Sequence, residues 1–126
     1  MNKEDFASFE QAKRLKALGY KQSVSNRLWY LNDGNIGEIS PIADANYREN
    51  VSCVMPTLAQ VCKWLRSKDI LIHPFLRSNN KYSVQIWKIS SYEILETLRG
   101  EFDTYEQAQS AGIDVVLELL EKSKKF

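Results

Sequence analysis

Residues 102–122, FDTYEQAQSAGIDVVLELLEK, carry the strongest structural signal in the chain, because they join a helix-start motif to a long periodic apolar pattern and a charged end. At about 100° per residue, Ala108, Ala111, Val115 and Leu119 form one stripe along a helix. Four further apolar residues widen this stripe past half of the circumference: Ile113, Val116, Leu117 and Leu120. The pattern predicts a core helix that packs on a sheet and also touches a second element or another chain.

Two residues of this helix, Ile113 and Leu117, lie at the outer edge of the apolar arc, beside the polar strip. We expect them to contact either an N-terminal helix or the same helix of a second copy in a homodimer. The N-terminal helix needs a partner too, because its own Leu15 and Leu18 are apolar. Ile113 and Leu117 are therefore candidate interaction residues.

Three helix starts share one motif, a Ser or Thr followed three residues later by Gln. In this capping box the hydroxyl and the Gln side chain satisfy each other's free backbone N–H groups. The boxes begin at Ser8, Thr57 and Thr104, and they predict helices over residues 9–18 and 57–67 and at the start of the core helix.

The strands follow from turn residues and from apolar alternation. Asp33-Gly34 between apolar segments predicts a β-hairpin, and Pro74 marks an edge position or a bulge in its strand. The predicted strands cover residues 27–31, 36–39, 70–76, 82–89 and 92–99. Residues 43–50 are polar and aperiodic, which predicts a mobile loop or a joint between subregions.

These elements predict an α+β fold in one domain over residues 1–126, because this length and a hydrophobic content of 44% suffice to bury a core. We expect an antiparallel sheet of about five strands with the helices from Thr57 and Thr104 packed on one face and the N-terminal helix as a third, covering helix. Residues 1–50 would form a helix and a hairpin, and residues 51–126 a core of helix, three strands and helix.

Features that would place the chain in a membrane or in an oxidising compartment are not apparent. No segment reaches the ~20 apolar residues of a membrane helix, and residues 1–9 lack the apolar part of a signal peptide. Cys53 and Cys62 form no CxxC pair, so we expect two free thiols. The chain is therefore predicted to be cytoplasmic and not to bind membranes.

Residue types that carry enzymatic chemistry are sparse. The chain has one histidine, His73, and no HxxxH, HxH or DxD spacing, so neither a catalytic triad nor a metal site is predicted. Glu93 and Glu96 differ in parity along one strand and would point to opposite faces, unlike the paired carboxylates of a glycosidase. The five glycines are scattered and build no phosphate-binding loop. We expect no enzymatic activity and no cofactor.

The net charge is +1, but the charges are unevenly distributed. Residues 51–100 carry seven Lys and Arg against three Asp and Glu, a balance of +4, whereas residues 101–126 carry three against six, a balance of −3. The candidate polyanion contacts in the middle segment are Lys63, Arg66, Lys68, Arg77, Lys81 and Lys88, with Tyr82 and Trp87 among them. Such residues can hold phosphates and stack bases, and they can equally form a solvated helix face and protect a sheet edge.

A second candidate surface is apolar. Leu71, Phe75 and Trp87 lie on the opposite strand face from Ile72 and Val84. This face needs a cover, either from the N-terminal half of the chain or from a partner.

From residue 57 to residue 122, the predicted order of helix, three strands and helix is similar to the topology of double-stranded RNA-binding domains. That family opens its second helix with a lysine-rich segment, whereas TYEQAQ at residues 104–109 has an acid and no lysine. The resemblance implies a topology and leaves the family's RNA contacts without matching residues.

MPTLAQVCKWLR at residues 55–66 and FDTYEQAQSAGIDVVLELL at residues 102–120 resemble a group of short uncharacterised α+β proteins that phages and prophages of gut bacteria carry. The resemblance covers the C-terminal half and rests on helix starts and core positions, which specify a fold better than an activity. It implies a small accessory protein of a mobile element and assigns no functional residue.

The sequence thus favours a non-enzymatic interaction or accessory module that binds an unidentified protein partner, as a monomer or a homodimer. The alternative is a nucleic-acid-binding accessory protein that uses the basic helix and hairpin surface.

Overall fold

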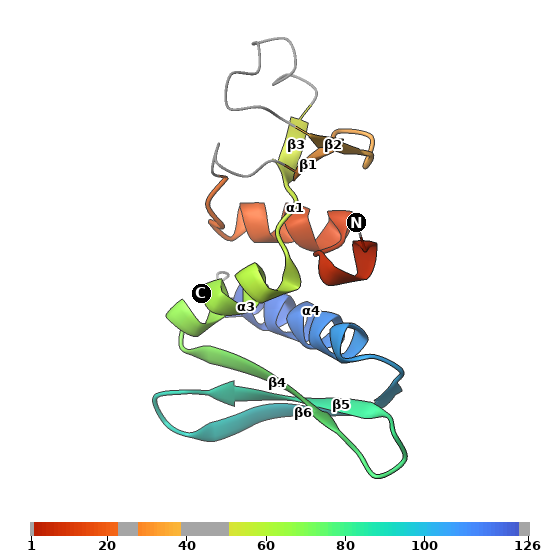
Figure 1. The fold of residues 1–126 in the computed structure, drawn as a ribbon. Coiled ribbons are helices and arrows are strands. Elements are labelled where there is room, and N and C mark those ends of the chain that lie inside the picture. The colour runs from red at the N-terminus through yellow and green to blue at the C-terminus, as the bar shows by residue number, and fades with distance from the viewer. Residues whose placement is uncertain (1, 23–27, 39–50, 124–126) are drawn as a thin grey trace.

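The computed structural model describes residues 2–22, 28–38 and 51–123, and these residues form an α+β fold (Figure 1). The helical elements are the 3-10 helix η1 (Lys3–Asp5) and the α-helices α1 (Phe9–Ala17), α3 (Leu58–Ser67) and α4 (Tyr105–Ser123). The strands are β1 (Leu28–Leu31), β2 (Ile36–Glu38), β3 (Val51–Val54), β4 (Ile70–Leu76), β5 (Tyr82–Lys88) and β6 (Glu93–Phe102). The predicted α+β class is confirmed, whereas the loop predicted at residues 43–50 lies outside the described residues.

The described strands form two antiparallel sheets of three strands each, with the orders β2-β1-β3 and β4-β5-β6. This corrects the prediction of one sheet of about five strands. The N-terminal hairpin is completed by β3, in which Cys53 lies opposite Tyr30. β3 has four residues, VSCV, and is too short for an alternating pattern to reveal it as a strand.

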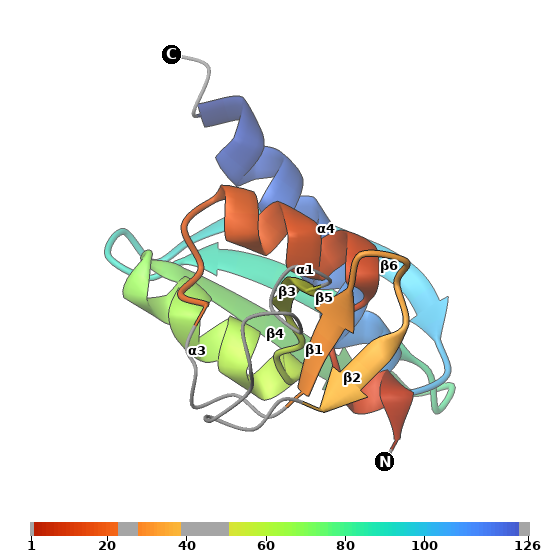
Figure 2. The same ribbon diagram turned by 90° about the horizontal axis from the view of Figure 1, so that it is seen from above.

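The elements are stacked in layers (Figure 1, Figure 2). α4 contacts all three strands of the β4-β5-β6 sheet, and α3 contacts β4, so both helices lie on one face of this C-terminal sheet. α1 contacts α4 on one side and β3 on the other. The N-terminal helix therefore lies between the helix layer and the small N-terminal sheet, and it packs on both.

α4 lies close to the C-terminal sheet because residue 112 is a glycine. A Cβ atom at Gly112 would lie 2.8 Å from Cγ2 of Ile72 and 3.1 Å from Cγ2 of Val84. Carbon atoms pack best at about 3.5–4.0 Å, so any side chain at this position would force the helix and the sheet apart.

The predicted helix starts at Ser8 and Thr57 are confirmed. Oγ of Ser8 accepts a hydrogen bond from the Gln11 N–H at 3.1 Å, and Oε1 of Gln11 accepts one from the Ser8 N–H at 2.9 Å. Thr57 and Gln60 form the same pair of bonds. These caps fix where α1 and α3 begin and hence how the chain enters each helix.

The main core lies between the helices and the C-terminal sheet. Ile113 and Leu117 are fully buried in it together with Leu15 of α1. Neither residue is on the surface of the single chain, which corrects their prediction as an interaction surface. The physical reason is that α1 turns its apolar face onto α4, so the intramolecular contact takes the place of a contact between copies.

A smaller core joins α1 to the N-terminal sheet and consists of Ala12, Tyr30, Cys53 and Met55. The Tyr30 hydroxyl donates a hydrogen bond of 2.5 Å to the Ala7 carbonyl, which satisfies the one polar atom of the tyrosine. α1 thus contributes to both cores. No helix among the described residues has the length and apolar character that a membrane crossing requires.

Candidate interaction surface

The outer face of the C-terminal sheet, defined by the side chains that point away from α3 and α4, has no cover among the described elements (Figure 1). Leu71 of β4, Trp87 of β5 and Ile94 of β6 lie side by side across this face. Leu71 and Trp87 are half-buried, and Ile94 is 48% exposed. On the opposite face, Ile72 and Ile86 are buried under the helices. The predicted split of the two strand faces is therefore present, and the described N-terminal half does not cover the outer one.

A pocket of about 290 Å³ opens on this face. Its lining is mostly apolar and includes one cation: Leu71, His73, Gln85, Trp87, Lys88, Ile89 and Tyr92. The rings of Trp87 and Tyr92 lie against each other, with centroids 5.3 Å apart and planes tilted by 59°. We call this site the Trp87–Tyr92 pocket.

Tyr92 is the most unusual residue of the pocket. It is 84% exposed and has a φ of 57°, in the left-handed region that Gly and Asn adopt more readily than aromatic residues. A bulky residue in this region costs on the order of 1 kcal/mol or more. The turn keeps Tyr92 there, since its N–H donates to the Ile89 carbonyl at 3.3 Å.

The turn that carries Tyr92 is tied to the junction of α3 and β4 by Asp69. The Asp69 carboxylate accepts hydrogen bonds from the Ser90 N–H at 2.9 Å and from the Ser90 hydroxyl at 2.5 Å. The Asp69 carbonyl accepts from the Ile89 N–H at 3.0 Å. The rim of the pocket is therefore held by three bonds from one residue of a different segment.

Phe75, the third predicted residue of the apolar surface, lies toward the other end of β4. Its ring is stacked on that of His73, with centroids 5.9 Å apart and an angle of 19° between planes. Phe75 lies four positions after Leu71 along an extended strand, about 13 Å at roughly 3.3 Å per residue. The structure therefore places Leu71 and Trp87 in the pocket and Phe75 beside it.

The six candidate polyanion contacts do not form one surface. Exposed side chains of α3 and its end supply Lys63, Arg66 and Lys68, and Lys88 pairs with Ile70 at the same end of β4. Arg77 and Lys81 lie in the turn at the opposite end, roughly 20 Å away along a strand of seven residues. The structure therefore divides the six predicted contacts between the two ends of β4, because residues that are near in sequence are separated by the length of this strand.

Two of these cations also have other contacts. Lys81 is paired with Asp103, and this hydrogen bond raises the pKa of the lysine. Nζ of Lys68 lies 5.3 Å from the ring centroid of Trp64 on α3. Lys88 is the one predicted cation that lines the Trp87–Tyr92 pocket.

The two thiols are structural. Cys53 and Cys62 are both buried, and burial raises the pKa of each thiol above its ordinary value. Nε2 of Gln109 donates to Sγ of Cys62 at 3.3 Å, which links α4 to α3. Buried protonated thiols are poor nucleophiles. Within the described residues, no group of three His, Cys, Asp or Glu side chains could hold a metal ion.

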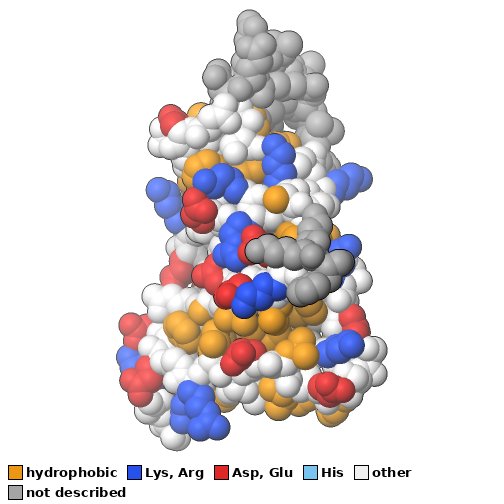
Figure 3. Space-filling view, turned by 180° about the vertical axis from the view of Figure 1, so that it is seen from behind, with side chains coloured by type: hydrophobic (Ala, Val, Ile, Leu, Met, Phe, Trp, Pro, Cys, Tyr) orange, Lys and Arg blue, Asp and Glu red, His pale blue; other side chains and the backbone are white. Residues whose placement is uncertain are grey.

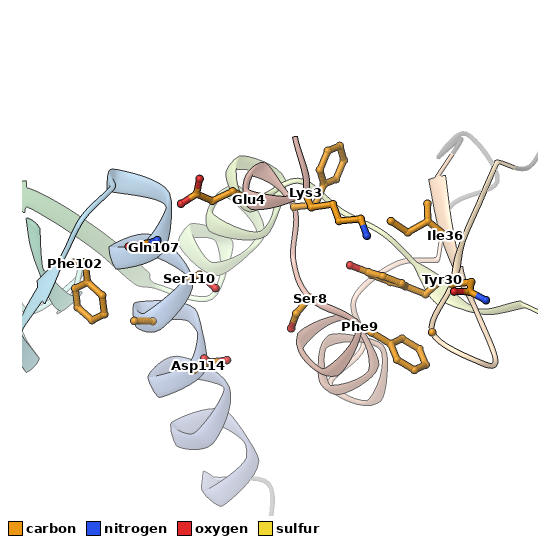
Figure 4. A pocket seen from close by; sticks show the side chains of 14 residues that line it. Lys3, Glu4, Ser8, Phe9, Tyr30, Ile36, Phe102, Gln107, Ser110 and Asp114 are labelled. Atoms are coloured by element: carbon orange, nitrogen blue, oxygen red, sulfur yellow. The ribbon is translucent and has the colours of Figure 1, made fainter. Parts of the chain in front are cut away.

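A larger hollow of about 930 Å³ lies between α4, the N-terminal segment and the β1–β2 turn (Figure 4). Three of its polar lining residues, Glu4, Ser110 and Asp114, are hydrogen-bonded to residues beside it. Nε2 of Gln11 donates to Oγ of Ser110 at 2.9 Å and to Oδ1 of Asp114 at 3.0 Å, and the Thr104 hydroxyl donates to Glu4 at 2.6 Å. We interpret this hollow as the seam between the two halves of the fold, because its polar groups hold α1 and η1 to α4.

Known protein families, curated proteins and solved structures include no match to this chain. The candidate site therefore rests on the geometry alone.

Sequence reasoning found Leu71 and Trp87 but missed Tyr92, Ile89 and Gln85. The register of β6 shifts between the partners of Ile86 and Trp87, so unbroken alternation from Leu98 would have placed Ile94 on the opposite face. The left-handed φ of Tyr92 had no sequence signal either, since the SSY turn contains neither Gly nor Asn.

Proposed function

We propose that this chain is a non-enzymatic protein-interaction module and that the Trp87–Tyr92 pocket receives an apolar or aromatic side chain of its partner. The observation that carries this proposal is the exposed Tyr92 ring, held in a strained backbone conformation against Trp87. Trp and Tyr supply most of the binding energy in many protein interfaces. A volume of about 290 Å³ is at the small end for a ligand pocket and suits one or two large side chains.

The polar groups around the pocket support a peptide-like partner. His73, Gln85 and Lys88 line it, and Trp87 already donates to Gln85 at 3.3 Å. Lys88 is exposed and lines the pocket, where a carbonyl or a carboxylate of the partner can meet it. An apolar centre with a polar rim is the usual anatomy of a protein interface.

The biological setting is part of the same proposal. On the resemblance of residues 55–66 and 102–120 to short phage and prophage proteins, we place the chain among accessory proteins of mobile elements and in the cytoplasm. Monomer and homodimer both remain compatible with a pocket that one chain forms by itself.

A nucleic-acid-binding role is the second candidate, and aromatic rings on an open sheet face favour it. Single-stranded nucleic acids stack their bases on such rings. Against it stand the dispersed cations and the three glutamates of β6, Glu93, Glu96 and Glu101. Affinity for a single-stranded oligonucleotide should then be undetectable even at low salt. Binding that weakens steeply with salt and is reduced by Lys63→Glu with Arg66→Glu would favour the second candidate.

The proposed pocket is tested by selecting binders from a displayed library of random peptides and measuring their affinity by fluorescence anisotropy. Tyr92→Asn should weaken binding by about tenfold or more, in line with interface hot spots. The variant should keep its stability, because relief of backbone strain and loss of the Trp87 contact are each on the order of 1 kcal/mol.

Tyr105→Ala is the matched control, since Tyr105 is also an exposed tyrosine but does not line the pocket. It should bind the selected peptides like the unmodified protein. Peptides that bind the Tyr92→Asn variant with unchanged affinity would refute the pocket as the binding site.

A further inference from the structure

β6 is a long edge strand of the C-terminal sheet. β6 has ten residues and pairs only with β5 among the described strands, so one row of its backbone N–H and C=O groups has no strand partner. Ile94 and Leu95 on this strand are 48% and 42% exposed. Open edges with apolar residues are sites at which another strand can add.

Beside this edge, α4 and β6 share an apolar strip. Gln109 of α4 faces α3, so the other flank of α4, which carries Val115 and Leu119, faces β6. Leu119 is 39% exposed, and Val115 and Leu98 are partly buried against the main core. Figure 3 shows hydrophobic side chains gathered on this side of the molecule, at the height of α4 and the C-terminal sheet.

The edge and the strip together fit a fourth strand. Neighbouring strands lie about 4.8 Å apart, and every second side chain points to the same face. A strand added to β6 would continue the sheet beneath the free flank of α4. Its inward side chains would then cover Leu98, Val115 and Leu119, while its backbone would bond to the open row of β6.

The charges of β6 indicate which kind of strand could pair with its open edge. Its exposed charged residues are Glu93, Glu96, Arg99 and Glu101, three acids against one base. Antiparallel pairing of β6 with the same strand of a second copy would bring these acids together near the symmetry axis, and like charges across strands are destabilising. A segment with Lys or Arg between apolar residues would be complementary instead.

We propose that β6 accepts an extended basic and apolar segment of a partner protein as a fourth strand. This inference rests on the proposed role as an interaction module, but it uses a different surface from the Trp87–Tyr92 pocket. Main-chain bonds would give the affinity, and the glutamates of β6 would select the partner.

The test uses two soluble ten-residue peptides, one alternating Lys with Val and one alternating Glu with Val, and amide hydrogen exchange of the full protein measured by NMR. With the Lys peptide at about ten times its Kd, exchange of the outward β6 amides should slow by about tenfold. The Glu peptide should leave β6 unchanged. Protection by neither peptide would overturn the proposal.

Two variants sharpen the result. Glu93→Lys with Glu96→Lys should weaken the Lys peptide by about tenfold, since each cross-strand charge pair changes sign. Tyr92→Asn should bind the Lys peptide unchanged, so failure at the pocket and failure at the edge are separate outcomes. β6 protection that appears without peptide and rises with protein concentration would assign the edge to a second copy and overturn the stated partner.

Discussion

Gln11 has two structural roles, one in capping α1 and one in joining α1 to α4. Its Oε1 atom caps α1, while its Nε2 atom donates to the Ser110 carbonyl at 3.1 Å, to the Ser110 hydroxyl and to Asp114 of α4. The side chain is 3% exposed, and no buried side-chain polar atom among the described residues lacks a partner. Removing such a group leaves several acceptors without their donor, which costs more than one hydrogen bond.

Gln11→Ala should therefore lower the free energy of unfolding by about 2–4 kcal/mol, the sum of a lost cap and of lost buried bonds. Gln60→Ala is the matched control, because Gln60 occupies the same position of the α3 capping box but is exposed. Its cost should stay below about 1 kcal/mol. Urea unfolding measures both, and equal losses would show that the contacts of Gln11 with α4 contribute nothing.

The buried thiols predict how stability changes at alkaline pH. Burial raises the pKa of Cys53 and Cys62 above the ordinary value of 9.0, so the folded protein keeps these protons longer than the unfolded chain does. Their contribution to stability is complete below pH 9 and is lost as the pH rises above it. Burial raises the pKa of Tyr20 and Tyr30 as well, which adds a loss in the same direction at higher pH.

Urea unfolding at pH 7 and at pH 10 should therefore show a smaller free energy of unfolding at the higher pH. The double variant Cys53→Ala with Cys62→Ala should show a smaller difference between the two pH values, although its stability at pH 7 is lower. An identical difference in both proteins would mean that the thiols titrate alike in the folded and unfolded chains.

Sequence patterns that act within one helix or strand predicted these elements correctly, whereas the packing between distant elements could not be predicted. The capping boxes placed α1 and α3 to within a residue or so, because hydroxyl and Gln act within one helical turn. Alternation identified β4 and β5 and put Leu71 and Trp87 on a common face. Neither signal tells which strand joins β1, and the arc of α4 does not tell whether α1 or a second copy covers it.

The candidate sites show the same difference between what short-range patterns predict and what depends on distant elements. Alternation along one strand is local, so half of the pocket lining could be predicted. Whether the basic residues form one patch depends on the positions of α3 and the β4–β5 turn in space. The structure places these two segments at opposite ends of β4. Tyr92 depended on the conformation of a turn whose residue types do not specify it.

The contact between α4 and the sheet predicts an unusual effect of Gly112→Ala. In an exposed helix this change would stabilise by about 1 kcal/mol. Here the new methyl would meet Ile72 and Val84, and we expect a net loss of about 1–3 kcal/mol from overpacking. Thermal or urea unfolding measures the sign, and a gain in stability would show that the helix can move away without cost.

At the scale of the molecule, α1 connects two cores that share no strand. Leu15 belongs to the main core and Ala12 to the smaller one, and a bidentate contact between Arg14 and Glu121 supports the α1–α4 side with bonds of 2.5–3.2 Å. The predicted single domain over residues 1–126 therefore depends on whether this one helix couples the two sheets.

We predict that both sheets unfold in one transition. The three tryptophans report on different parts, Trp29 in β1, Trp64 in α3 and Trp87 in β5. Fluorine NMR of protein labelled with fluorotryptophan should give the same urea midpoint for all three signals, as two-state unfolding requires. An earlier midpoint for Trp29 alone would mean that the N-terminal sheet is an independent unit.

The bond between Gln11 and Ser110 joins residues 99 positions apart, and this distance also separates them in time during synthesis. At about 5–20 residues per second, the ribosome needs roughly 5 to 20 s to make the intervening chain. Throughout that interval α1 has no α4 to pack on, and its apolar face is open to chaperones and proteases. The main core cannot close until α4 has left the exit tunnel, whereas the smaller core contains no residue of α4 and can form earlier.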